Sequence, residues 1–507
     1  MQVCSEVKNA TENDILLYNG LLLTMNEKDE IIEGGQILIQ NGEIIDIGKD
    51  LDVRDGVRRR IDCRGKIVMP GLCNCHSHLE EIVERGMIAS MPLEPWFFYK
   101  IAMENYLDLP AEEIEIVICH ACIEMIRNGV TSVFHHYYGR PSLTLERTKP
   151  VVRAFEKIGM RAILTPAISD IKIQDTIPLE MNSLPYELKR KLVETQPPSV
   201  EECLGTSEEI VEYIKSCSRL INVALGPSGP QRCSDRLLLE IKKLAEKHKI
   251  RIHTHLLETK VQAMMGHRLY GKTIVEHMED LGILFPGLTV AHTIWVTHRD
   301  IDLLAKYGVG VVHNPASNLK LGDGICPVKR MMKIGVNVGL GTDGANCGDT
   351  YSVFDQVRLV SLIHNIANPD PDLWVTPKEA LRMGTVNGGR IISYGDSVGS
   401  LEKRKRADII ILRPSITYIP FNDVINQLAY TETGHSVETV MIDGHIVMEG
   451  GIIKTVNEDE IYGEIGNIAA RLFENKEEAN LEGRLFEPYL MEMHRRVAKE
   501  WVFDPMR

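Results

Sequence analysis

Short apolar runs alternate with amphipathic segments through the middle of the chain. Each run has the length of a strand and each following segment has the period of a helix, which is the pattern of parallel β/α units. The eight runs lie at residues 66–78, 129–138, 160–169, 221–230, 250–258, 288–295, 308–318 and 336–346. They predict an α/β fold, a (β/α)8 TIM barrel over residues 67–400, whose open mouth is formed at the carboxyl ends of the strands.

The two ends of the chain have a different pattern, in which short strands are separated by turns. Asn-Gly pairs at 19–20 and 41–42 favour hairpins because both residues accept a positive φ. The pattern returns near the C-terminal end, where an Asp-Gly pair at 443–444 marks another turn. We therefore expect residues 1–66 and 401–455 to form one small β-sandwich domain, with the barrel inserted between its two parts.

Residues 456–507 are rich in charge and have heptad-like apolar spacing. This pattern predicts a C-terminal helical extension. Packing or contact between subunits is its expected role, rather than catalysis.

Composition and charge narrow the function classes. Of the 507 residues, 44% are hydrophobic and 25% are charged, which is typical of a folded chain with a sizeable core. The net charge of −14 would repel nucleic acid and anionic lipid, so we expect neither as a partner. The chain has no secretory signal pattern and no apolar run of membrane-spanning length, so we expect a soluble, cytoplasmic protein.

The number and spacing of the cysteines indicate free thiols, as in a reducing compartment. The chain has 11 of them, scattered without the spacing of a disulfide framework or a zinc finger. Cys73 and Cys75 alternate with His76 and His78, so a thiolate metal cluster is an alternative interpretation there. Imidazole and carboxylate ligands are the more common choice in hydrolytic sites.

The polar ends of several predicted barrel strands carry groups that bind metals. His76 and His78 close the first run in His-x-His spacing, and side chains two residues apart on a strand point to the same side. The fifth, sixth and eighth runs carry His255, His292 and Asp343 near their ends. Because the strand ends meet at the mouth of a barrel, we expect these groups to gather around one metal ion.

Longer motifs make the chain similar to the amidohydrolase superfamily, and within it to the branch of triazine hydrolases and methylthioadenosine/S-adenosylhomocysteine deaminases. The matching segments, in the family's order, are PGLCNCHSHLEE, HTHLLET, VAHTIWV, HNPASNLKLGDGICPV, GLGTDGAN and GSLEKRKRADIIIL. The resemblance implies a barrel, a β-sandwich and a mononuclear site. In that site His76, His78, His255 and Asp343 would bind one divalent ion per chain, Zn²⁺ or, as the second choice, Fe²⁺.

Two further properties follow from the same resemblance. Binuclear relatives need a carboxylated Lys on the fourth strand, and residues 221–230 contain no Lys, which favours a single metal. Homo-oligomers are usual in the family, so we expect one here, with a small-molecule substrate as the other partner.

The resemblance also assigns catalytic roles. The metal would lower the pKa of its bound water toward ~7, so that hydroxide is available at neutral pH. Asp343 would accept the proton of that water and later pass it to the leaving group. His292 would orient the water or polarise the developing alkoxide, and Glu258 would protonate a ring nitrogen of the substrate. Loss of ammonia would complete a hydrolytic deamination of an amino-substituted N-heterocycle.

Five residues outside the ligand set are candidates for substrate binding. The segment after the first strand resembles a part of nucleoside deaminases in which a Glu and a Trp enter the pocket, here Glu94 and Trp96. The strand ends and loops of the last three runs add Trp295, His313 and Asn346. An aromatic plate beside a carboxylate would suit a planar heterocycle that forms hydrogen bonds.

Three more histidines lie close to these positions in the sequence. His253 precedes the ligand position His255 by two residues and should point the same way, one layer deeper in the barrel. Packing in the core or support of a ligand is its expected role. His135 and His136 close the second run, and either could line the pocket.

Departures from the nucleoside deaminases favour a smaller substrate. Ser228 stands where those enzymes commonly carry a His after the fourth strand. We therefore expect a triazine, pyrimidine, pterin or cyclic guanidine. Three alternatives stay open. The same site could release chloride, an alkylamine or a ring amide, or the protein could be a methylthioadenosine/S-adenosylhomocysteine-type nucleoside deaminase. The third alternative is a scaffold protein without catalytic activity.

Overall fold

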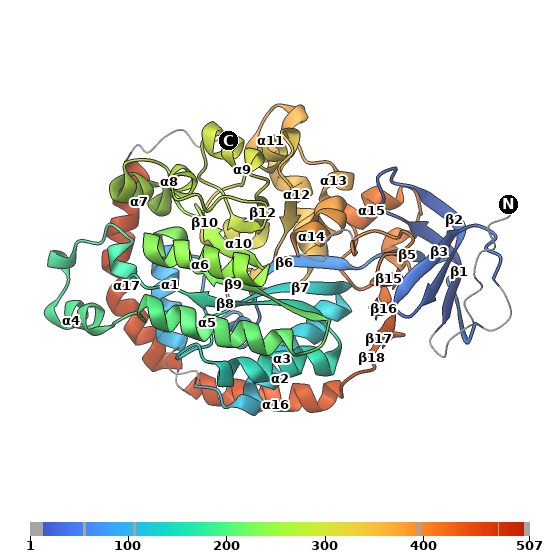
Figure 1. The fold of residues 1–507 in the computed structure, drawn as a ribbon, viewed down its shortest axis with the longest axis horizontal. Coiled ribbons are helices and arrows are strands. Elements are labelled where there is room, and N and C mark those ends of the chain that lie inside the picture. The colour runs from blue at the N-terminus through green and yellow to red at the C-terminus, as the bar shows by residue number, and fades with distance from the viewer. Residues whose placement is uncertain (1–13, 54–56, 105–107, 393–396, 475, 501–507) are drawn as a thin grey trace.

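A ring of parallel strands forms the centre of the molecule, with helices around it and a small sheet at one side (Figure 1). The computed structural model describes residues 14–53, 57–104, 108–392, 397–474 and 476–500. The ring strands are β6 (Leu72–His78), β7 (Val130–Tyr137), β8 (Arg161–Ile168), β9 (Ile221–Pro227), β10 (Arg251–Leu256), β11 (Leu288–His292), β12 (Gly310–His313), β13 (Val338–Leu340) and β14 (Asp343–Gly344).

The ring is closed. Consecutive strands from β6 to β13 pair in parallel, and β14 pairs in parallel with β6. Since β13 and β14 follow each other with only two residues between them, they are two parts of one interrupted strand. The structure therefore confirms the predicted (β/α)8 barrel.

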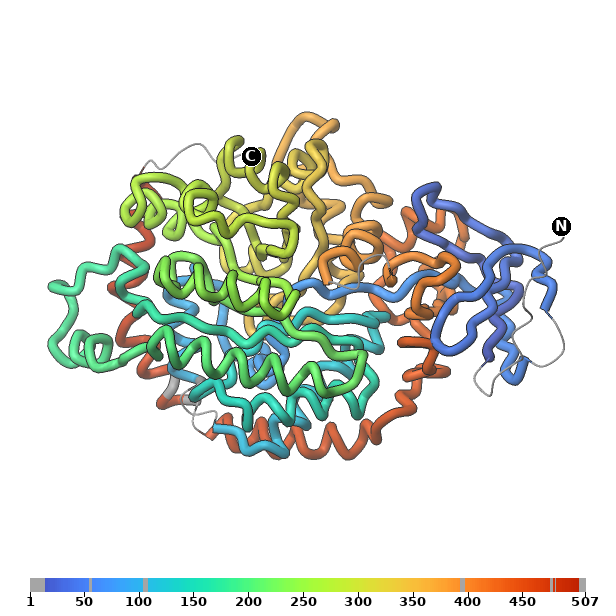
Figure 2. Tube along the Cα trace, in the orientation of Figure 1, coloured from blue at the N-terminus to red at the C-terminus, as the bar shows by residue number. Residues whose placement is uncertain are grey.

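Helices enclose the barrel and cover its outer face (Figures 1 and 2). Several begin at a hydroxyl that accepts a backbone N–H, as at Ser199, which forms a capping box with Glu202. The helices are α1 (Leu93–Glu104), α2 (Ala111–Arg127), α3 (Leu145–Ile158), α4 (Tyr186–Glu194), α5 (Val200–Lys215), α6 (Asp235–His248), α7 (Lys260–Tyr270), α8 (Ile274–Asp280), α9 (His298–Lys306), α10 (Pro315–Leu321), α11 (Val328–Lys333), α12 (Val353–Ala367), α13 (Pro377–Gly384), α14 (Val386–Ile391), α15 (Val424–Tyr430), α16 (Glu458–Glu474) and α17 (Lys476–Lys499).

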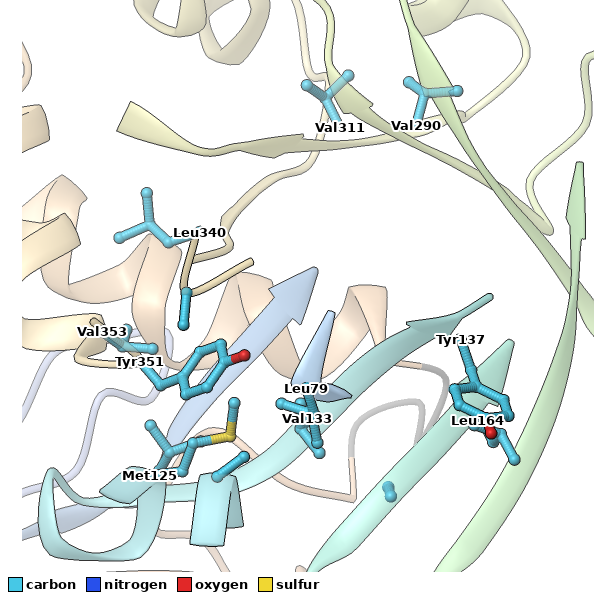
Figure 3. Close-up of a cluster of buried hydrophobic side chains, with 14 of the residues drawn as sticks. Leu79, Met125, Val133, Tyr137, Leu164, Val290, Val311, Leu340, Tyr351 and Val353 are labelled. Atoms are coloured by element: carbon cyan, nitrogen blue, oxygen red, sulfur yellow. The ribbon is translucent and has the colours of Figure 1, made fainter. Parts of the chain in front are cut away.

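Adjacent residues on the barrel strands pack into different apolar cores, as the two-residue period of a strand requires. Val133 and Val311 belong to the large core between strands and helices (Figure 3). Their neighbours Phe134 and Val312 belong to a separate cluster with Ile391 of α14, inside the ring. The barrel is thus filled below its mouth, and the open space for a ligand lies above this filling.

The small sheet is built from both ends of the chain, as predicted. Its strands are β1 (Ile15–Leu23), β2 (Ile31–Gln40), β3 (Glu43–Gly48), β4 (Arg59–Asp62), β5 (Ile67–Pro70), β15 (Ile409–Leu412), β16 (Val437–Ile442), β17 (His445–Glu449) and β18 (Ile452–Ile453). All are joined by hydrogen bonds, in the order β18-β17-β16-β15-β5-β1-β2-β3 with β4 beside β1. The Ile44 N–H in β3 donates to the Lys405 carbonyl before β15 at 2.8 Å, so the sheet curls around its own core.

Two of the three predicted turns connect paired strands. Residues 41–42 join β2 to β3, and residues 443–444 join β16 to β17, with positive φ at all four positions. The hairpin expected at Asn19 and Gly20 is wrong, because both residues lie inside β1. Asn19 has a φ of 63° at a shift in register between β1 and β2, so the pair forms a bulge.

The run at 66–78 contributes to both sheets. Its first part is β5, which pairs with β1 and β15, and its second part is β6 of the barrel. The strands change sheets at Gly71, where a Cβ atom would overlap the side chain of Thr131. In the structure the small domain therefore extends four residues beyond residue 66, through β5.

The C-terminal helices lie along the barrel (Figure 1). Helix α17 packs against α1, where the rings of Phe98 and Phe486 lie 5.0 Å apart and the Tyr99 hydroxyl donates to Glu487 at 2.5 Å. The extension thus packs against the helix that follows β6 and its short helix. Within the described ranges, every helix is too short or too polar to span a bilayer.

A buried ion network connects the barrel to the small sheet. Arg161, at the start of β8, donates to Asp408 at 2.7 and 2.9 Å and to Asp443 at 3.2 Å. The Arg161 side chain is 3% exposed. Arg219 also donates to Asp443, at 3.0 Å, but its side chain is 68% exposed.

Replacement of Arg161 by Met should therefore cost far more stability than replacement of Arg219 by Met. Removal of one partner from a buried pair leaves uncompensated charge, so we expect Arg161→Met to lower the free energy of unfolding by about 3–5 kcal/mol. Arg219→Met should lower it by about 0–1 kcal/mol, because solvent screens an exposed pair. Denaturant titration measures both values, and equal losses would contradict a network buried at this junction.

Candidate metal centre and active site

Four side chains from three barrel strands, β6, β10 and β14, converge at the mouth of the barrel. Asp343 Oδ1 lies 3.5 Å from His76 Nε2 and 3.4 Å from His78 Nε2. His255 Nε2 lies 3.3 Å from His78 Nε2. Metal–ligand bonds of about 2.1 Å in a tetrahedron require donors about 3.4 Å apart, and these three distances agree with that spacing.

The imidazoles are oriented for metal binding by their other nitrogen. Nδ1 of His78 donates to the His136 carbonyl at 2.7 Å, and Nδ1 of His255 donates to the Ser228 carbonyl at 2.7 Å. Each Nε2 therefore presents a lone pair to the shared centre. Burial lowers the pKa of both rings well below the usual value, which favours this neutral form. Nε2 of His76 is buried and has no hydrogen-bond partner among the described residues, which also fits a metal ligand.

The backbone is strained at two of these strand ends. His292, Thr293 and Asp343 have φ values of 71°, 50° and 62°, a region that residues other than Gly rarely adopt. Such conformations persist only where the surrounding structure holds them, and they concentrate at functional sites. Asp343 in β14 has this backbone conformation, and its carboxylate is held by two hydrogen bonds. It accepts them from Ser317 Oγ at 2.7 Å and from the Gly344 N–H at 2.9 Å.

Glu258 and His292 lie next to the ligand set. Glu258 Oε1 is 3.4 Å from His292 Nδ1, and His292 Nε2 is 3.8 Å from Asp343 Oδ2. Asn318 Oδ1 fixes the His292 ring through Nδ1 at 2.9 Å. Burial, followed by the carboxylates of Asp343 and Glu94, raises the pKa of Glu258 well above its usual range. The structure thus brings together all six residues predicted for metal binding and catalysis.

The remaining histidines occupy three different places. His253 lies below the ligands, with its Nε2 2.8 Å from His76 Nδ1 and its ring against Phe134 at 4.3 Å. The ring of His136 is 4.8 Å from that of His255. His135 points away from the centre, because its Nδ1 accepts the Leu79 N–H at 3.3 Å.

A cavity opens directly above the centre. It is lined by His78, Glu81, Leu93, Trp96, Phe97, Lys100, Tyr138, Ser228, Gln231, Arg232, His255, Glu258, Gln262, His292, Leu321, Asp343 and Cys347. Trp96 is the one predicted substrate-binding residue in this wall. The cavity combines the aromatic rings of Trp96, Phe97 and Tyr138 with a larger number of polar side chains, which suits a flat, polar small molecule.

Four predicted substrate-binding residues are not among those that line this cavity. Glu94 accepts the hydroxyl proton of Thr259 at 2.8 Å, and the indole N–H of Trp295 donates to the Asp323 carbonyl at 2.8 Å. His313 packs against the ring of His364 at 5.8 Å. Asn346 donates to Glu84 at 2.6 Å. Each is near the strand end or loop expected from the sequence, and its side chain contacts other protein groups.

Sequence reasoning missed a charged pair in the same wall. Lys100 Nζ lies 2.9 Å from Glu81 Oε1, and both side chains are buried. The sequence does contain a signal for Lys100. It follows the predicted substrate-binding residue Trp96 by four residues, and positions four apart share one face of a helix. Arg232, which lines the cavity after β9, carried no comparable motif.

The thiolate alternative receives no support. Cys73 and Cys75 lie in the apolar cluster inside the ring, and burial raises the pKa of Cys73 to about 12. In the part of the chain that the structure describes, the groups able to hold a metal consist of His76, His78 and His255, and of His76, His292 and Asp343.

Comparison with known proteins shows matches along most of the chain. The model of the amidohydrolase family matches residues 67–447. A 5-methylthioadenosine/S-adenosylhomocysteine deaminase of Desulforamulus reducens is 30% identical over 469 residues, which cover 91% of this chain and 99% of that enzyme. A 5′-deoxyadenosine deaminase of Methanothermobacter thermautotrophicus is 33% identical over 436 residues, or 84% of this chain and 92% of that enzyme.

A solved structure agrees in fold. The adenosine deaminase of Xanthomonas campestris, crystallised with bound zinc, superposes with a TM-score of 0.80 at 24% identity. The match covers 90% of this chain and 98% of that chain. At this identity the likeness establishes the fold.

Proposed function

Because this chain belongs to the amidohydrolase family, we propose that it is a metal-dependent hydrolytic deaminase that releases ammonia from an amino-substituted N-heterocycle. The observation that carries the proposal is the convergence of four metal-binding atoms with a buried carboxyl, Glu258, at the floor of one aromatic cavity. We assign the metal to His76, His78, His255 and Asp343, with zinc as the first choice and iron as the second.

Each nearby side chain has a task in this reaction. A divalent ion held at the site would supply Lewis-acid activation of water and of the developing charge. Asp343 accepts a proton from the attacking water at its carboxylate, which Ser317 holds in place at 2.7 Å, and passes it to the amino group, which leaves as ammonia. Glu258 carries a proton to a ring nitrogen as the neighbouring carbon becomes tetrahedral, and its raised pKa suits a proton donor. His292, fixed by Asn318, orients the attacking water.

A nucleoside is the second candidate substrate, and one observation favours it besides the names of the relatives. Tyr138, Ser228 and Arg232 line the cavity above the metal-binding residues and also line a wider groove that contains Arg140 and Gln196. The groove gives a substituent on the ring a place to lie. Ser228, where the sequence departs from nucleoside deaminases, stands between the two spaces.

Ammonia release from a panel of compounds tests the function. We expect the zinc-loaded protein to deaminate at least one of cytosine, melamine, pterin, guanine, creatinine, adenosine and methylthioadenosine. Removal of the metal by a chelator should lower the rate by more than about 100-fold, and about one Zn²⁺ per chain should restore it, because a bound ion would supply the activation of the attacking water. Absence of both metal binding and ammonia release would refute the proposal. Mass measurement in solution tests the further proposal of a homo-oligomer.

A further inference from the structure

We propose that Lys100 determines substrate specificity by donating a hydrogen bond to an oxo group on the substrate ring. The inference rests on the proposed deaminase function and narrows its substrate class. It selects rings that carry the leaving amino group and an oxo group in the arrangement of a 2-amino-4-oxopyrimidine, with the oxo group on the edge opposite the nitrogen that faces Glu258.

Lys100 is held rigidly in the cavity wall. Its side chain is 2% exposed, its Nζ lies 2.9 Å from Glu81 Oε1, and that Nζ stands 4.4 Å above the ring of Tyr138. A buried ammonium is costly unless it is paired, so the carboxylate and the aromatic face fix it in one place. An ammonium carries three N–H bonds and can therefore donate to a bound molecule while it keeps Glu81.

Lys100 and Glu258 both line the cavity, and their contacts come from different strands of the barrel. The Tyr138 ring, beneath the ammonium, stacks on the ring of His78 at 5.2 Å, so Lys100 belongs to the β6 and β7 side of the mouth. Glu258 lies against His292 at 3.4 Å, on the β10 and β11 side. A flat ring above the metal-binding atoms would meet Glu258 at one edge and Lys100 at the other.

Glu258 and Lys100 would present different chemistry to the two edges of the substrate ring. Glu258 can give a proton to a ring nitrogen, whereas Lys100 offers only a donor and a positive charge. A ring oxo group is an acceptor with partial negative charge, and hydrogen bonds to a charged donor are stronger than neutral ones. A ring without that group would leave a buried ammonium facing an apolar edge, which disfavours its binding.

Two matched pairs of compounds test this specificity. Isocytosine and guanine carry the oxo group, and 2-aminopyrimidine and 2-aminopurine lack it. Within each pair, kcat/KM for the oxo compound is divided by kcat/KM for the compound without the oxo group. This ratio is measured in the wild type, in Lys100→Met, and in the double variant Glu81→Gln with Lys100→Met. The double variant avoids an unpaired buried carboxylate. Loss of one charge-assisted hydrogen bond should lower the ratio by about 10- to 100-fold in both variants.

A binding measurement separates this proposal from the proposed function. In the Glu258→Gln background, the dissociation constants of isocytosine and 2-aminopyrimidine are measured by calorimetry with and without Lys100→Met. Binding of isocytosine that weakens by about 10-fold or more with Lys100→Met supports the role of Lys100 even if no ammonia is released. Failure of the panel above, by contrast, counts against deamination.

Arg232→Met is the matched control, because Arg232 is a second cation in the same wall, placed over the ring of Phe97 at 4.7 Å. It should change the ratio within each pair by less than about 3-fold, since the proposed bond comes from Lys100. Equal losses for both members of a pair in Lys100→Met would mean that Lys100 only neutralises Glu81. That result overturns the proposal, as does the absence of both binding and turnover for the two oxo compounds.

Discussion

Asp343→Asn should abolish turnover, with kcat lower by at least about 10⁴-fold, while the protein stays folded. The carboxylate is 3.4 to 3.5 Å from two histidine ligand atoms and is the only acidic group that we assign to the metal. An amide keeps its size and can still accept from Ser317, but it carries no charge and cannot take up a proton. The substitution therefore removes a metal ligand and a proton acceptor together, and steady-state ammonia release measures the loss.

Asp349→Asn is the matched control, since Asp349 lies in the same loop and pairs with Lys320 at 2.6 Å. That ion pair is partly exposed, so we expect kcat to change by less than about 3-fold. Metal analysis of Asp343→Asn should give less than the one ion per chain of the wild type. Turnover of Asp343→Asn at the control's level would mean that the reaction centre lies elsewhere.

The barrel and its reactive centre could be predicted from the sequence because they depend on local patterns. Apolar runs set the strands, and polar residues at their carboxyl ends must gather once the ring closes. His76 and Asp343 are far apart in the chain, yet β14 pairs with β6 and brings them within 3.5 Å. Topology alone therefore explains the proximity of these two side chains.

The cavity wall could not be predicted in the same way, because its composition depends on side-chain direction and on competing partners. Trp295 follows β11 at the expected place, but the Asp323 carbonyl accepts its indole N–H, and Trp295 is not among the residues that line the cavity. Lys100 can lie buried in the cavity wall because its positive charge is paired with Glu81, a residue of the short helix after β6. Neither partner is visible in the spacing of the motifs.

Glu258→Gln should lower kcat by about 10² to 10⁴-fold and leave the metal in place, since general acid–base catalysis contributes effects of this size. Glutamine has the same shape, and the backbone N–H of residue 258 would still donate to Gln262 Oε1, as it does at 2.9 Å in the wild type. The amide cannot deliver a proton to the ring nitrogen. Because Glu258 is not one of the four assigned ligands, about one metal ion per chain should remain, and this retention separates Glu258→Gln from Asp343→Asn.

The effect on KM distinguishes a proton donor from a binding group. A group that acts mainly in the transition state lowers kcat and kcat/KM together when it is removed, whereas loss of ground-state binding raises KM at constant kcat. We expect the first pattern, since burial and the neighbouring carboxylates raise the pKa of Glu258 and favour its protonated form. Glu258→Asp, which keeps the carboxyl but shortens its reach, should retain more activity than Glu258→Gln. If Glu258→Gln instead retains turnover near the wild-type rate, another group protonates the ring and Glu258 has no catalytic role.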